Sequence, residues 1–94
     1  MPEYRIAHIR EQGQDMIIVP LESRFLNRPA AEKESFRLAL QRCAAQHRLK
    51  GTDCLVWNYG RRFYFLAPPP WRLFFKGLSM AAVNRNINKK ITCR

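Results

Sequence analysis

The sequence has no aspartate or glutamate between positions 54 and 94, although that segment holds eight of the 17 lysines and arginines. The formal net charge of the chain is +10, and this segment supplies most of it. Such one-sided charge attracts polyanions, including nucleic acids, acidic proteins and anionic lipids, without selecting among them. Arginines outnumber lysines twelve to five, which favours geometric recognition of phosphate or carboxylate.

Long apolar runs are also missing. The longest run in the first thirty residues, Met16 to Val19, is far shorter than the core of a signal peptide or a membrane span. Cysteine is scarce, and an odd number without a C-x-x-C pair argues against a disulfide framework and for a reducing compartment. We therefore expect a cytoplasmic protein with three small, buried cysteines: Cys43, Cys54 and Cys93.

Length and composition predict one small folded domain over residues 1–94. The chain is 47% hydrophobic and 12% aromatic, which is too apolar for intrinsic disorder. A domain of this size has a thin core, so its aromatic side chains must supply much of the burial.

Residues 4–21 alternate in polarity around Gln12-Gly13, which predicts a β-hairpin. A two-residue loop there places Arg10 opposite Asp15. Because Pro20 lacks a backbone N–H, the second strand is expected to end at this residue or to lie on a sheet edge. One face of the hairpin then groups Tyr4, Ile6, His8, Ile17, Val19 and Leu21.

A long helix is predicted from Pro29, which suits a first helical turn, to about Lys50, with Gly51 as its stop. Its main apolar face is expected to pack on the sheet. That face consists of Phe36, Ala39, Leu40, Cys43 and His47. A second stripe on the far side needs cover from the C-terminal segment or from a partner protein. That stripe consists of Leu38, Ala45 and Leu49.

Residues 53–67 predict a second hairpin around Asn58-Tyr59-Gly60. With those three residues as the loop and Gly60 left-handed, Trp57 shares a face with Phe63, and Arg62 and Tyr64 lie on the opposite face. A four-residue loop shifts the pairing by one residue, so the register stays open.

Three prolines end the second hairpin, and two short helices are predicted after them, over 71–76 and 80–90. Gly77 permits the break between them, and Ser79 is a good N-cap. The predicted fold is α+β, in ββαββα order. It consists of an antiparallel sheet of two hairpins, one long helix packed on that sheet, and a broken C-terminal helical segment.

Residues 77–88, GLSMAAVNRNIN, are similar to the turn and second helix of a helix-turn-helix motif. The resemblance implies that Leu78 and Val83 face inward and that Asn84, Arg85 and Asn88 face a DNA groove. The preceding helix departs from the motif. The RNP1 pattern of RNA-recognition modules does not match, because Arg62 and Tyr64 stand where a glycine and a small residue are required.

The leading functional prediction is a non-enzymatic module that binds RNA or DNA by phosphate neutralisation with some aromatic stacking. The residues expected to act are Tyr59, Arg61, Arg62, Tyr64, Arg72, Lys76, Asn84, Arg85, Asn88, Lys89 and Lys90. The alternative is an adaptor or inhibitor that docks an acidic protein. Its expected contact residues are Leu38, Ala45, Leu49 and Trp71.

Catalysis is the weakest prediction. A small ribonuclease would need His8, Arg62 and Tyr64 to meet, which requires that both hairpins share a sheet. Cys43, His47, Cys54 and Cys93 are four potential zinc ligands, but their spacing matches no zinc module. No glycine-rich phosphate loop is present. We therefore predict no metal and no cofactor.

Overall fold

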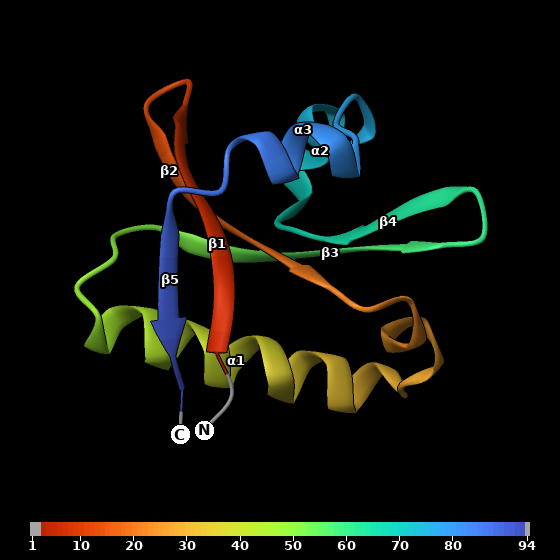
Figure 1. Ribbon diagram of the computed structural model, residues 1–94, viewed down its shortest axis with the longest axis horizontal. Helices are drawn as coiled ribbons and strands as arrows, with labels where there is room; N and C mark the ends of the chain where they lie inside the picture. Colours follow the sequence, from red (N-terminus) through yellow and green to blue (C-terminus); the bar gives the residue numbers. More distant parts are fainter. Residues whose placement is uncertain (1–2, 94) are drawn as a thin grey trace.

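The computed structural model describes residues 3–93 and contains one five-stranded sheet between two helical layers (Figure 1). The elements follow in the order β1 (Glu3–Glu11), β2 (Gln14–Leu21), 3-10 helix η1 (Ser23–Asn27), α1 (Ala30–Gln46), β3 (Thr52–Tyr59), β4 (Arg62–Leu66), 3-10 helix η2 (Pro69–Trp71), α2 (Arg72–Lys76), α3 (Met80–Arg85) and β5 (Lys89–Thr92). The sheet order is β4-β3-β2-β1-β5.

The sheet buries apolar side chains on both faces. On one face, Ile17 and Leu55 pack with Leu40 of α1, and this cluster is called the α1-side core. On the other face, Ile18 and Val56 pack with Phe75 of α2 and Val83 of α3. Because successive strand residues point to opposite faces, the runs Met16 to Val19 and Cys54 to Trp57 are buried throughout.

The predicted all-antiparallel sheet is wrong, because β2 and β3 pair in parallel, with Met16 opposite Thr52. The other three pairings are antiparallel. The physical reason is α1, which carries the chain back along the sheet before β3 begins. A strand that follows such a helical crossover runs in the direction of the strand before it.

The first hairpin is confirmed, with Arg10 opposite Asp15 and a two-residue loop in which Gln12 and Gly13 both have positive φ. The expectation for Pro20 is wrong, because β2 lies inside the sheet and continues to Leu21. Pairing of β1 with β2 stops at Ala7 opposite Ile18, and the two strands then diverge (Figure 1). In that register Pro20 would face β1 with no N–H to donate, which explains the divergence.

The long helix is confirmed, but it ends at Gln46 rather than near Lys50. Arg48 adopts a left-handed φ of 61°. The amide of Leu49 donates to the carbonyl of Ala44 at 3.0 Å, and that of Arg48 donates to Ala45 at 2.9 Å. These two bonds form a Schellman cap, which ends a helix without glycine at the left-handed position. Ala39, predicted to face inward, is exposed.

The second hairpin has a two-residue loop, Gly60-Arg61, in place of the predicted three-residue loop. Gly60 is left-handed as expected, with φ 63°. The shorter loop moves the register, so that Trp57 lies opposite Tyr64 and shares its face. Phe63 therefore lies on the other face, against the α2/α3 side.

The C-terminal segment combines a confirmed break with an unpredicted strand. Ser79 caps α3 by accepting from the amide of Ala82 at 3.2 Å, but this helix ends at Arg85 and not near residue 90. β5 follows and pairs with residues 3–6 of β1. A strand forms here in place of the predicted helix because β1 offers an open edge for pairing. The strand also buries Ile91, which is 4% exposed, in the α1-side core.

The prediction that the three cysteines are free is also wrong. Cys43 of α1 is disulfide-bonded to Cys93, immediately after β5, and Cys54 is the free buried cysteine among residues 3–93. The sequence argument for a reducing compartment therefore no longer holds. Within residues 3–93, none of the helices is both long and apolar enough to cross a membrane.

Candidate nucleic-acid interface

The β3-β4 hairpin brings three of the predicted site residues together on one face. Tyr59 lies directly opposite Arg62, and Tyr64 follows Arg62 on the same face because side chains alternate along a strand. Tyr59 is 46% exposed and Arg62 is exposed. Tyr64 is half-buried, and its ring stacks on Trp57 with centroids 6.0 Å apart and planes 9° from parallel. We call Tyr59, Arg62 and Tyr64 the hairpin face.

A lysine of α1 extends this surface. Lys33 Nζ lies 5.4 Å from the centroid of the Trp57 ring, the same ring on which Tyr64 stacks. An ammonium over an indole face is attracted by the negative face of the ring. Sequence reasoning missed Lys33, because no local signal shows which strand a helical side chain will overlie.

The charge of the hairpin face is not neutralised within the described chain. Ion pairs among residues 3–93 involve only Arg24, Arg37 and Lys90 as cations. Lys33, Arg61 and Arg62 form none, and the hairpin itself contains no acid after Asp53. An exposed face with unpaired cations beside aromatic rings suits a ligand that carries both negative charge and flat bases.

Two further predicted cations lie on the opposite side of the sheet. Arg72 and Lys76 are exposed on α2, which covers the α2/α3 side. They line a pocket of about 280 Å³ together with Phe65, Leu66 and Ala67. They therefore flank β4 but do not belong to the hairpin face.

The remaining predicted residues lie on α3, which packs over β2 and β3, and on β5, the other edge of the sheet. Asn84 and Arg85 are exposed on α3, and Lys89 and Lys90 are exposed on β5. Lys90 Nζ lies 3.5 Å from a carboxylate oxygen of Glu3. Since β4 and β5 are opposite edges of the sheet, the predicted residues do not form one continuous surface.

Asn88 has a structural position that the helix-turn-helix comparison did not predict. It lies outside α3, and its side-chain amide hydrogen-bonds the backbone of His8 in both directions, each at 2.9 Å. The amide thus extends the β1-β5 pairing by one residue. Because α3 is only six residues long, Asn84, Arg85 and Asn88 do not lie on one helix, as the expected DNA-groove contact requires.

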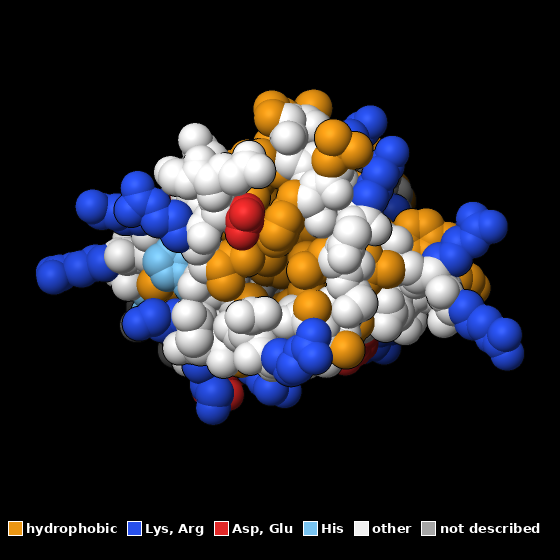
Figure 2. Space-filling view, turned by 90° about the horizontal axis from the view of Figure 1, so that it is seen from above, with side chains coloured by type: hydrophobic (Ala, Val, Ile, Leu, Met, Phe, Trp, Pro, Cys, Tyr) orange, Lys and Arg blue, Asp and Glu red, His pale blue; other side chains and the backbone are white. Residues whose placement is uncertain are grey.

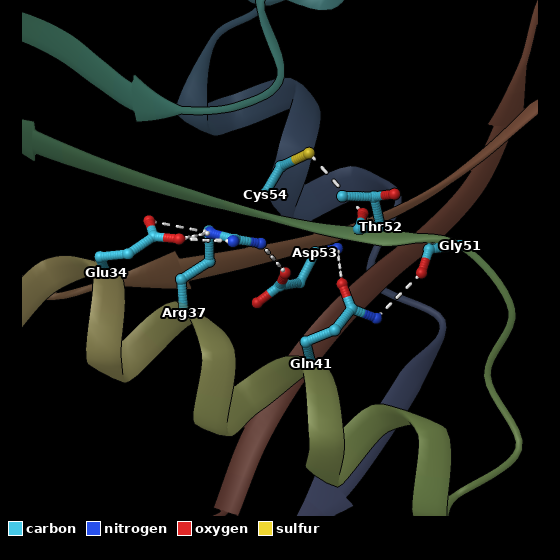
Figure 3. Close-up of polar contacts among 7 residues, drawn as sticks. All are labelled: Glu34, Arg37, Gln41, Gly51, Thr52, Asp53 and Cys54. Atoms are coloured by element: carbon cyan, nitrogen blue, oxygen red, sulfur yellow. Dashed lines mark hydrogen bonds and ion pairs between the residues drawn. The ribbon is translucent and has the colours of Figure 1, made fainter.

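A polar network joins α1 to the start of β3 (Figure 3). Arg37 donates to Asp53 at 3.0 Å and to Glu34 at 2.6 Å. Gln41 accepts from the amide of Asp53 at 2.9 Å and donates to the carbonyl of Gly51 at 3.0 Å. Both side chains span the gap between helix and strand, so the network fixes their relative position.

Burial controls the protonation of this network. Asp53 is fully buried, and one of its oxygens has no hydrogen-bond partner within residues 3–93. Desolvation raises the pKa of its carboxyl to about 6 against the opposing effect of Arg37. The hydrogen bond from Arg37 lowers the pKa of Glu34. Burial also raises the pKa of the Cys54 thiol to about 12, so this cysteine is unreactive at neutral pH.

The residues proposed for a ribonuclease do share a sheet, but they do not meet. His8 lies on β1 and Arg62 and Tyr64 lie on β4, with β2 and β3 between them. His8 Nε2 donates to the carbonyl of Lys50 at 2.7 Å. Over residues 3–93, no three His, Cys, Asp or Glu side chains are grouped as metal ligands would be.

The residues of the adaptor alternative are also separated. Leu38 is 44% exposed and Ala45 is exposed, but Leu49 packs against the α1-side core. Trp71 packs against the other face of the sheet. A partner therefore cannot contact all four through one flat surface.

A hollow lined by both apolar and polar residues lies between the β1-β2 turn and the η2-α2 segment. It measures about 810 Å³, and its lining includes Met16, Trp71, Leu73 and Phe74 together with Glu11, Gln12, Gln14 and Thr52. Figure 2 shows apolar side chains around a central hollow, with lysine and arginine side chains towards both ends of the view. Leu73 is 84% exposed.

Comparisons with protein-family models, with curated proteins and with solved structures find no match for this chain.

Proposed function

We propose that this protein binds single-stranded nucleic acid through the hairpin face. The observation that carries the proposal is the adjacency of Tyr59, Arg62 and Tyr64 on one face of the hairpin, where Arg62 has no ion-pair partner among residues 3–93. Unpaired bases expose flat faces on which aromatic side chains stack, whereas the bases of a duplex are already stacked on each other. This chemistry favours a single strand over a duplex.

The spacing of the three side chains fits alternating stacking and charge neutralisation. Directly opposite residues of an antiparallel pair lie about 5 Å apart, and residues two apart on one strand lie about 7 Å apart. A chain of nucleotides crossing the hairpin face would place bases on Tyr59 and Tyr64 and a phosphate beside Arg62. Arg61 and Lys33 border the same path from the loop and from α1.

The cations farther from the hairpin face contribute long-range electrostatic attraction to the nucleic acid. Exposed cations on other elements, away from the hairpin face, are Arg72, Lys76, Arg85, Lys89 and Lys90. Such charges speed the encounter with a polyanion and add affinity that depends on salt but not on base sequence.

The test is fluorescence-anisotropy titration with a labelled single-stranded RNA of mixed sequence at about 50 and 200 mM salt. We expect a dissociation constant below about 1 µM at the lower salt and a steep, log-linear loss at the higher. Arg62→Glu should weaken binding about tenfold or more and reduce the salt slope by about 0.7. Arg42→Glu, on an exposed position of α1, makes the same change of net charge and is the matched control.

A stacking variant separates ring contacts from charge. Tyr59→Ala should cost about 1–3 kcal/mol of binding without changing the salt slope. Equal effects of Arg62→Glu and Arg42→Glu would refute a localised site and leave only diffuse attraction by net charge.

A further inference from the structure

The outer edge of β4 has backbone groups that no other strand of the described chain uses. β4 is the last strand of the sheet order, and the pair Tyr59-Arg62 flanks a two-residue loop. In hairpins of this kind the flanking pair exchanges both backbone hydrogen bonds. The amides and carbonyls of residues 62, 64 and 66 therefore point to β3, and those of Phe63 and Phe65 point outward.

This edge also lacks the protection found at the other edge. β5 is only four residues long and carries Lys89 and Lys90, a usual defence against strand pairing. β4 carries one charge, Arg62, at its start, followed by Phe63, Tyr64, Phe65 and Leu66, which are all half-buried. An aromatic edge with free hydrogen-bonding groups is a template for an additional strand.

A cationic pocket adjoins this edge. Arg72 and Lys76 stand four residues apart on α2 and line the pocket of about 280 Å³ with Phe65, Leu66 and Ala67. Residues four apart in a helix lie on the same side of it. Neither cation forms an ion pair among residues 3–93. A side chain from an added strand would meet apolar walls and two free positive charges here.

We propose that β4 binds an extended, acidic segment of another protein as a sixth strand of the sheet. Backbone hydrogen bonds to Phe63 and Phe65 would hold the segment, and its carboxylates would meet Arg72 and Lys76. This site uses the open edge and the α2 side, so it is separate from the hairpin face and does not depend on the proposed nucleic-acid binding.

Charge argues against a second copy of this chain as the occupant. Antiparallel pairing of two β4 strands would bring Arg61 and Arg62 of one copy beside the end of β4 in the other, where Arg72 and Lys76 lie. Glu34 lies near that end, but on the α1 side, and Arg37 already holds it. The like charges would therefore oppose self-pairing.

The test uses a labelled peptide of about ten residues that alternates valine and glutamate, with a valine-lysine peptide as the charge control. The variant Phe63→Pro removes an outward amide without removing a bond to β3, and Phe63→Val is its matched control. We expect the acidic peptide to bind the wild type and Phe63→Val, and to bind Phe63→Pro about tenfold more weakly. Arg72→Glu/Lys76→Glu should abolish binding, and Tyr59→Ala should not change it.

A second measurement does not depend on the folding of Phe63→Pro. Two versions of the acidic peptide, N-methylated on alternate sets of amides, are titrated against the wild type. Strand addition predicts that one version binds normally and the other about tenfold more weakly, because only one set of amides faces β4. Equal binding of both versions would overturn the proposal. So would peptide binding that is lost in Tyr59→Ala, as RNA binding should be, or a concentration-dependent dimer of the protein in sedimentation.

Discussion

The disulfide between Cys43 and Cys93 is predicted to supply about 4 kcal/mol of the free energy of unfolding. It joins α1 to the residue after β5, across a sequence separation of 50. Closing a loop of this length lowers the entropy of the unfolded chain by an amount equivalent to about 4 kcal/mol at 25 °C. A chain of 94 residues has a total stability of about 5–14 kcal/mol, so reduction removes a large part of it.

Urea unfolding, followed by tryptophan fluorescence with and without a thiol reductant, measures this contribution. With a slope of about 1.5 kcal/mol per molar urea, the midpoint should fall by about 3 M on reduction. Cys93→Ser should already unfold at the lower midpoint and should not respond to reductant. The same midpoint for oxidised and reduced wild type would refute the reasoning, as would more than one alkylated cysteine in the unreduced, denatured protein.

Three further changes test the core and the sheet by urea unfolding. Asp53 has a folded-state pKa of about 6, above its ordinary 3.8, so the native state binds the proton more tightly. The contribution of Asp53 to the free energy of unfolding therefore falls by up to about 3 kcal/mol as pH rises from about 4 to 6. Asp53→Asn should remove this part of the pH dependence of stability, and parallel pH profiles of variant and wild type would contradict the prediction. Asn88→Ala should cost about 1–3 kcal/mol, because two backbone groups of β1 lose their partner, whereas exposed Asn84→Ala should cost less than about 0.5; equal losses would argue against the amide clamp. Gly51→Ala should cost more than about 2 kcal/mol, because its Cβ would lie 2.4 Å from the carbonyl oxygen of Asp15. Gly60→Ala has open space and should cost about 1 kcal/mol, so similar losses at the two glycines would contradict the packing around Gly51.

Local signals predicted the elements that local chemistry controls. The alternation around Gln12-Gly13 gave the correct register of the first hairpin, and Ser79 marked the start of α3. The length of α1 was overestimated because Arg48 takes the left-handed cap position, for which its sequence gives no signal. Helix propensity describes the average preference of a residue, whereas the C-terminal cap of α1 is determined by two specific backbone hydrogen bonds.

Non-local features could not be predicted in the same way. β5 forms on the edge of β1 that faces away from β2, and its partners, residues 3–6, lie at the other end of the sequence. The disulfide depends on β5, since only that strand brings Cys93 to α1. Pro20 is tolerated inside the sheet because its missing N–H faces the side where the strands have already diverged.

The candidate site was predicted in part. Tyr59, Arg62 and Tyr64 were identified from composition, yet the predicted loop placed Tyr64 on a different face from Trp57, on which it in fact stacks. The contribution of Lys33 depends on how α1 crosses β3, which no local pattern encodes. Strand order puts Lys89 and Lys90 at the far edge of the sheet, whereas other predicted cations lie on α2 and α3, which cover the opposite face.

The most direct test of the nucleic-acid proposal is a ¹H-¹⁵N NMR titration of the protein with a short single-stranded oligonucleotide. We expect the largest shift changes to cluster at residues 57–64 and at Lys33, with only small, uniform changes around α3 and β5. Changes centred on Arg85, Lys89 and Lys90, or no localised changes at any ratio of oligonucleotide to protein, would contradict it.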